Sequence, residues 1–146
     1  GRGLNLHPEK TRLVDLTIPG EGFDFLGYHF EGSTRWPRKK SLRKFQDAIR
    51  SKTRRGNGHS LRVIIEEVNP TLRGWFEYFK HSHKWTFTSM DQWVRRRLRS
   101  ILRRRRYHKG ISHGFDHQRW PNAFFRAHGL FSLVEAHRAV LQSSRG

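Results

Sequence analysis

The longest amphipathic pattern in the chain covers residues 61–80 (LRVIIEEVNPTLRGWFEYFK). Its apolar positions are 61, 64, 65, 68, 72, 75, 76 and 79, which is the three- and four-residue spacing of a helix. The resulting stripe is wide enough to contact neighbouring elements on two sides. Because Pro70 removes a backbone donor and crowds the turn before it, the pattern predicts a kink or short break at Asn69 and Pro70.

Two further amphipathic patterns flank this central helix. The first runs from a capping Ser41 to about Arg55, and the second from about Met90 to Arg106. Each has one apolar side for a core, while its other sides carry mostly basic residues. Three such helices with short connections fit an antiparallel bundle.

The two ends of the chain differ from this helical centre. Residues 13–18 and 23–30 carry the apolar positions of two short strands, separated by a Pro-Gly-Glu-Gly turn, and residues 32–40 are predicted as a linker. The predicted fold class is therefore mainly α, with a short N-terminal β-hairpin, an antiparallel three-helix bundle and a short helical C-terminal tail. After the bundle we expect an irregular segment at 111–120 and short helices at 121–127 and 133–141.

The charge of the chain is strongly positive and unevenly distributed. Lys and Arg number 30 against 12 Asp and Glu, a net charge of +18. Residues 38–55 carry nine basic residues and one acid, and residues 95–109 carry nine basic residues and no acid. A surface that only kept the protein in solution would intersperse its signs. Two basic segments beside a neutral central helix instead favour a polyanionic partner, with nucleic acid the leading candidate.

Other classes of protein fit the composition less well. No run of 18 or more apolar residues exists, so we expect no membrane partner. The chain has no Cys, which removes disulfides and thiolate metal sites and is compatible with a reducing cytoplasm, the expected location. His108, His113 and His117 beside Asp116 are the closest histidine cluster, but their spacing matches no metal motif, so no metal site is predicted.

The candidate nucleic-acid contacts lie mainly in the two basic segments. Phosphate binding by a surface of this kind is specific for polyanions but does not choose between RNA and DNA. Trp36, inside a basic cluster, either stacks on a base or ribose or packs beneath the hairpin. The candidate contacts are Arg38, Lys39, Lys40, Lys44, Lys52, Arg54, Arg55, Arg73, Arg95, Arg96, Arg99, Arg103 and Arg106.

Four motifs in order along the chain resemble group II intron-encoded reverse transcriptases. Residues 69–79 (NPTLRGWFEYF) resemble the signature of their maturase domain, also called domain X or the thumb. The other motifs are PEKT at 8–11, FDFLGY at 23–28, and WPNAFF at 120–125 followed by GLFSL at 129–133. The likeness therefore spans nearly the whole chain.

The resemblance implies three regions: the end of a reverse-transcriptase palm at 1–35, the maturase or thumb bundle at 36–109, and a C-terminal helical extension at 110–146. Gly27 would belong to the primer grip, where the backbone approaches the primer strand. Lys10 would lie near the phosphates of the incoming nucleotide, or else be a solvated cation beside Glu9. Arg73 either reaches a nucleic-acid backbone or pairs with Glu77.

The implied partners are structured group II intron RNA and the RNA/DNA template–primer duplex, with a separate fingers–palm chain as a further possibility. Nucleotide addition needs paired carboxylates that hold two metal ions. The family's Tyr-x-Asp-Asp motif is absent here, and the adjacent Glu66 and Glu67 diverge on a helix. We therefore expect no catalytic residue and no cofactor in this chain, and Mg²⁺ in the palm that it lacks.

Two other functions remain open at this stage. The chain could be a stand-alone RNA-binding or RNA-chaperone domain, although such a bundle has no need of primer-grip motifs. It could also be an active enzyme, as a nuclease or as a polymerase assembled from split chains. A palm sequence upstream of Gly1 would decide the polymerase question.

Overall fold

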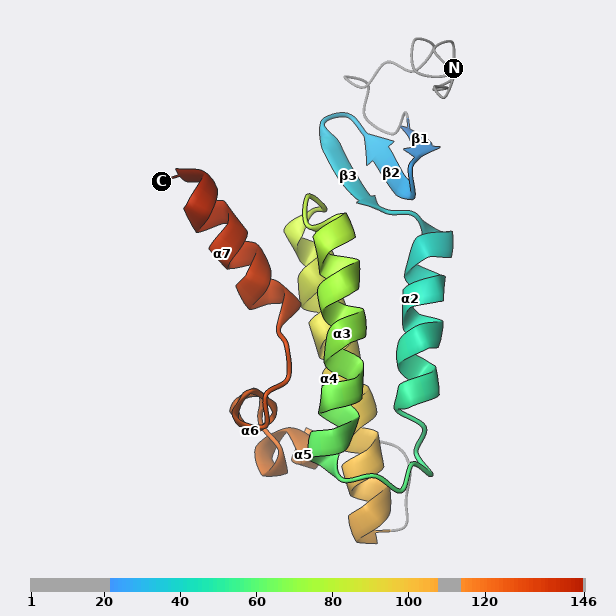
Figure 1. The fold of residues 1–146 in the computed structure, drawn as a ribbon, viewed down its shortest axis with the longest axis vertical. Coiled ribbons are helices and arrows are strands. Elements are labelled where there is room, and N and C mark those ends of the chain that lie inside the picture. Colours follow the sequence, from blue (N-terminus) through green and yellow to red (C-terminus); the bar gives the residue numbers. More distant parts are fainter. Residues whose placement is uncertain (1–21, 108–113, 146) are drawn as a thin grey trace.

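The computed structural model describes residues 22–107 and 114–145, in which a small sheet is followed by helices (Figure 1). Lys10 and the strand candidate at 13–18 lie outside these residues. The predicted fold class is confirmed, since the described chain is mainly helical with antiparallel strands before the helices. The elements are β1 Gly22–Phe25, β2 Tyr28–Glu31, β3 Thr34–Pro37, α2 Lys39–Lys52, α3 Leu61–Phe79, α4 Lys84–Tyr107, α5 Gly114–Arg119, α6 Asn122–Ala127 and α7 Leu133–Arg145.

The sheet is antiparallel with strand order β1-β2-β3, and its boundaries differ from the prediction. Residues 23–30 are not one strand, because the chain turns back at Leu26 and Gly27, where Phe25 pairs with Tyr28. Both turn residues have positive φ, 53° and 86°, as a two-residue hairpin turn with the twist of the strands requires. The predicted linker at 32–40 instead supplies β3 and the start of α2.

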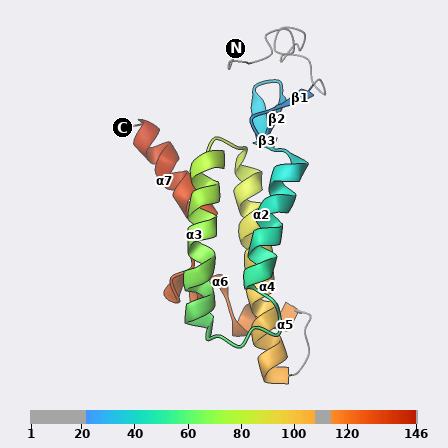
Figure 2. The same ribbon diagram turned by 45° about the vertical axis from the view of Figure 1, so that its right-hand side comes forward.

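Helices α2, α3 and α4 lie side by side and run alternately down, up and down the long axis (Figures 1 and 2). The central stripe of α3 is buried as predicted, including Ile64, Val68 and Leu72, each at most 1% exposed. It packs against Phe45 and Ile49 of α2, and against an apolar stripe of α4. The fully buried members of that stripe are Phe87, Val94, Leu98 and Ile101.

Helix α3 is continuous through Pro70, so the predicted break is wrong. The donor that proline removes would have bonded the carbonyl of Glu66, four residues earlier. Both Glu66 and Pro70 are exposed, and water can therefore satisfy that carbonyl. Packing of the buried stripe on two neighbours holds the helix together across this position.

Helix α4 begins at Lys84, six residues before the predicted start at Met90. Phe87 extends the buried stripe by one turn, and its ring lies 5.4 Å from that of Phe76 on α3. Residues 84–89 include two Thr and one Ser. These residues have weak helix propensity, so the sequence pattern did not predict the first turn of α4. A short helix, α5, also replaces part of the segment predicted as irregular.

Two buried polar side chains attach the C-terminal tail to the bundle. Asn69 of α3 donates to the carbonyl of Gly129 and accepts from the amide of Phe131, both at 2.8 Å. Asp91 of α4 accepts from the amides of Leu133 and Val134 at 2.9 and 3.0 Å, which caps the start of α7. The residues of the 69–79 and 129–133 motifs therefore bind one another directly.

Replacing Asn69 by alanine is expected to lower the free energy of unfolding by about 1–3 kcal/mol, because two backbone groups of the tail lose their partners. Urea denaturation followed by circular dichroism measures the change. The matched control is the exposed Glu66→Ala on the same helix, which should stay within about 0.5 kcal/mol. Equal effects of the two substitutions would contradict the role assigned to Asn69.

Candidate nucleic-acid interface

The surface between α2 and α4 brings the two basic segments together around Trp93. The guanidinium of Arg50 on α2 lies 5.4 Å from the centre of the Trp93 ring, and that of Arg97 on α4 lies 5.7 Å from it. Arg97 also donates to the hydroxyl of Thr53 at 2.7 Å and to its carbonyl at 3.1 Å. These bonds fix one arginine of α4 beside the end of α2.

Several cations converge on this surface, which has few acids to balance them. Burial lowers the pKa of Arg97, and the nearby positive charges of Arg50 and Arg55 lower it further. Arg43 precedes Arg50 by seven residues, and Arg104 follows Arg97 by seven, which puts each on the same helix face as its partner. Asp47, paired with Arg50 at 2.8 Å, is the single acid of α2. We call Arg43, Arg50, Arg55, Arg97 and Arg104 the seam cations.

A second arginine stripe of α4 faces the tail rather than solvent. Arg99, predicted to contact nucleic acid, is only 2% exposed, so its side chain lies inside the protein rather than on the open surface. Its guanidinium donates to the carbonyl of Trp120 at 2.8 Å and to the side chain of Asn122 at 2.9 Å, and it lies over the ring of Phe125. The basic residues of α4 are therefore divided between an open side and a side that the C-terminal tail covers.

The neighbours of Arg99 on this stripe also have partners in the protein. Arg103 binds Asp116 at 3.1 Å, and their side chains are 15% and 2% exposed. Arg95 is half-buried, which lowers its pKa, and it lies near Asp91 and Arg126. The contact positions predicted at 95 and 103 therefore belong to the tail-facing stripe, one turn to either side of Arg99.

The other predicted contacts differ in their surroundings. Lys52 donates to the hydroxyl of Thr71 at 2.6 Å, which ties α2 to α3. The guanidinium of Arg73 lies over the ring of Phe131, 5.4 Å from its centre, so its described contact is with the tail rather than with Glu77. Arg38 is half-buried at the start of α2. The exposed members of the predicted set are Lys39, Lys40, Lys44, Arg54, Arg55, Arg73, Arg96 and Arg106.

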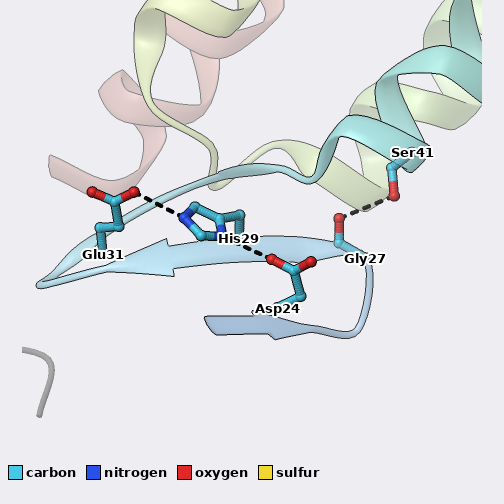
Figure 3. A network of polar contacts seen from close by, with 5 residues as sticks. All are labelled: Asp24, Gly27, His29, Glu31 and Ser41. Atoms are coloured by element: carbon cyan, nitrogen blue, oxygen red, sulfur yellow. Dashed lines mark hydrogen bonds and ion pairs between the residues drawn. The ribbon is translucent and has the colours of Figure 1, made fainter. Parts of the chain in front are cut away.

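Gly27, predicted to lie at a primer grip, joins the sheet to the bundle. Its carbonyl accepts from the amide of Arg38 at 2.8 Å and from the hydroxyl of Ser41 at 3.0 Å (Figure 3). A Cβ at this position would lie 3.5 Å from the rings of Tyr78 and Phe79. The positive φ of 86° disfavours any side chain here, and a Cβ would also lie only 3.3 Å from the hydroxyl of Ser41, so contacts within the chain account for the glycine.

The outer sheet carries a histidine held between two carboxylates (Figure 3). His29 Nδ1 lies 2.7 Å from Asp24, and Nε2 lies 2.9 Å from Glu31. Both hydrogen bonds raise the pKa of His29. Trp36 lies beside His29, with ring centres 6.4 Å apart, and beside His83 at 6.1 Å, so it is half-buried between two rings. A hollow of about 640 Å³ is lined by the His29 cluster and by the basic residues that follow it, namely Asp24, His29, Glu31, Trp36, Pro37, Arg38, Lys39 and Lys40.

The ion-paired His29 makes the stability of the chain depend on pH. Because its folded pKa is raised above the ordinary 6.5, the stabilisation is complete below about pH 6.5 and is lost as pH rises through the folded pKa. Between acidic and alkaline pH, the free energy of unfolding of the wild type should therefore fall by up to about 1 kcal/mol relative to that of His29→Gln. The effect is small because the pair is partly exposed. Denaturation at a series of pH values measures this difference. A difference that does not change with pH would contradict it.

Sequence reasoning overlooked five residues of the interface. Trp93 was not selected from the sequence, because its role depends on which face of α4 meets α2. Four of the five seam cations, Arg43, Arg50, Arg97 and Arg104, belong to the two basic patterns but were not selected as contacts. The available signal was the four-residue spacing of Trp93 and Arg97, which places an arginine over an aromatic ring.

Neither a metal-binding group nor a membrane-spanning helix is found among the described residues. His108 and His113 of the closest histidine cluster lie outside them, while Asp116 is buried next to Arg103. Within residues 22–107 and 114–145, no group of three His, Asp or Glu side chains has an arrangement that could hold a metal ion. In the same residues no helix combines the length and apolar character that crossing a membrane requires.

Comparison with known proteins identifies the bundle. Residues 42–120 match the family described as "Group II intron, maturase-specific domain". The match runs from the first turn of α2 to Trp120, whose carbonyl binds Arg99, and covers more than half of the 146 residues. No curated protein matches the chain. The chain therefore belongs to the family of group II intron maturase-specific domains.

Proposed function

We propose that this chain binds structured group II intron RNA through the α2–α4 surface and so supports splicing. Membership of the maturase family implies a role in group II intron splicing. The observation that carries the proposal is the convergence of Arg50 and Arg97 on the Trp93 ring, with the charge of Arg55 near Arg97. Like charges placed together weaken a fold slightly, so their arrangement favours an anionic partner.

An RNA duplex suits this surface better than isolated anions. A-form RNA presents its phosphates and 2′-hydroxyls across a wide, shallow minor groove, and proteins bind it mainly by shape and backbone contacts. Helices α2 and α4 run in roughly the same direction (Figures 1 and 2). The seven-residue spacing of Arg43 and Arg50 on α2, and of Arg97 and Arg104 on α4, gives each helix a row of cations, as a backbone-binding surface requires. In this proposal the intron RNA supplies the splicing chemistry and the protein stabilises its folded form.

The chain also carries a proposed second role, as the thumb of a reverse transcriptase that holds the template–primer duplex. Residues 1–35 would be the end of the palm, 36–109 the thumb, and 110–146 an extension that packs on it. The close packing of Gly27 against Tyr78 and Phe79 supports a fixed orientation of the hairpin turn on the bundle. Catalysis would need a fingers–palm portion with its Mg²⁺ ions.

A binding and splicing assay tests the proposed function. The purified chain should bind a folded group II intron RNA more tightly than an unstructured RNA of equal length, and should raise the fraction spliced at limiting Mg²⁺. Equal affinity for the two RNAs, with no effect on splicing, would favour a general RNA-binding domain instead. Adding a fingers–palm chain and a primer–template, with cDNA as the readout, tests the second role.

A further inference from the structure

A hollow lies between the first turn of α4 and the face of α7 that carries Val134 to Leu141. It has a volume of about 370 Å³, and its walls include Lys84, Trp85, Phe87, Val134, Arg138 and Leu141. We call it the tail groove. Lys84, Trp85 and Phe87 lie in the first turn of α4. The other three, Val134, Arg138 and Leu141, lie in α7, outside the family match at 42–120.

The groove combines an exposed aromatic ring with cations. Trp85 is 63% exposed and Leu141 46%, although both are large apolar residues. Phe87 and His137 form the floor, with ring centres 4.7 Å apart. Burial lowers the pKa of His137, which keeps its ring neutral near pH 7. The charged residues lining the groove, Lys84 and Arg138, are both positive.

Arg138 also lines a second, smaller hollow of about 190 Å³ at the junction of α4, α6 and α7, together with Arg95 and Arg126. The Nε atom of Arg95 is buried there and has no hydrogen-bond partner among the described residues. Both acids of this hollow already have partners, one of which, Arg126, lines the same hollow. Glu135 binds Arg126 at 2.5 Å, and the carboxylate of Asp91 accepts from two α7 amides and from Ser132.

We propose that the tail groove binds one unpaired nucleotide of RNA, with its base stacked on Trp85 and its phosphate on Arg138 and the neighbouring arginine hollow. Aromatic rings next to cations are the usual means of holding single-stranded nucleic acid. A helical protein segment would use the apolar walls but would leave Lys84 and Arg138, the two cations of the groove, without an anion. The inference rests on the proposed RNA-binding function and extends it from duplex RNA to an unpaired base.

A short single-stranded RNA hexamer containing 2-aminopurine tests the groove separately from the seam. Its fluorescence should change on binding the wild-type chain, and Trp85→Ala should weaken binding by about 5- to 150-fold, the range for one stacked base. Trp85→Phe should retain most of the affinity, whereas Trp85→Leu, which keeps an apolar side chain without a ring, should behave like Trp85→Ala. Trp85 is exposed, so circular dichroism should show all three variants folded.

A paired RNA duplex serves as the second ligand and separates this inference from the proposed function. Duplex affinity should be unchanged in Trp85→Ala and reduced in a variant with Arg43, Arg50 and Arg104 replaced by glutamine. The inference is overturned if Trp85→Ala binds the hexamer like the wild type while the duplex still depends on the seam. If the wild-type chain binds neither the hexamer nor the duplex, the proposed function is overturned as well. Trp85-dependent dimerisation in sedimentation, with hexamer binding unchanged, would assign the groove to a second copy of the chain.

Discussion

Replacing Arg99 by alanine is expected to lower the free energy of unfolding by roughly 2–5 kcal/mol. Arg99 heads the largest fully buried side chains of the described residues, so truncation opens a cavity between α4 and α6. It also removes the donor to the carbonyl of Trp120 and the cation over the Phe125 ring. In this variant the C-terminal tail should therefore separate from α4 before the rest of the bundle unfolds.

Arg96 provides the matched control for this substitution. It is exposed, lies on the same helix, and carries the same charge. Arg96→Ala should stay within about 0.5 kcal/mol of the wild type. Thermal or urea denaturation gives both values, and hydrogen exchange should show faster exchange in residues 120–130 for Arg99→Ala alone. Equal stability of the two variants would contradict the structural role of Arg99.

Replacing three exposed seam cations by glutamine, in the variant Arg43→Gln, Arg50→Gln and Arg104→Gln, is expected to weaken binding of an RNA duplex by about 10²- to 10⁴-fold. Each buried or phosphate-paired charge-assisted hydrogen bond contributes on the order of 1–2 kcal/mol. The three side chains lie along one direction of the α2–α4 surface, so one duplex can contact them together. Filter binding or fluorescence anisotropy at fixed salt measures the loss.

A control with the same change in charge separates local contacts from the general attraction of a basic protein. Arg62, Lys80 and Arg119 lie outside the α2–α4 surface, and replacing all three by glutamine removes three charges as well. We expect this control to reduce affinity by less than about tenfold, because long-range attraction is screened beyond a Debye length of about 10 Å. Similar losses in the two triple variants would mean that RNA responds to net charge rather than to the seam.

The sequence predicted the helices well wherever a long apolar stripe was present. The 61–80 pattern gave α3 within one residue at its end, because burial on two neighbours requires the full stripe. The start of α4 was missed because Thr86 and Thr88 have weak helix propensity, and packing of Phe87 outweighs it. The third strand was missed because residues 32–36 have a polar, glycine-containing sequence, and pairing with β2 sets their conformation.

The candidate site was predictable in composition but not in detail. Basic residues of α4 are spaced around the whole helix, and a sequence does not reveal which side the tail will cover. Arg99 and Arg103 therefore resembled Arg97 and Arg104 until the contacts of the tail with α4 were known. Similarly, Asn69 stood out only as part of a family motif, while its function as a clamp depends on residues 60 positions later. The local spacing of residues does not predict long-range contacts of this kind.

The dependence of RNA-duplex affinity on salt tests the central claim most directly. For the wild type, about 6–10 phosphate contacts would lower the association constant by about 10³- to 10⁵-fold between 50 and 200 mM salt. In the seam variant the logarithmic slope should be smaller in magnitude by about 2–3, whereas the control variant should keep the wild-type slope. A seam variant with the wild-type slope would contradict the assignment of the α2–α4 surface as the phosphate-binding site.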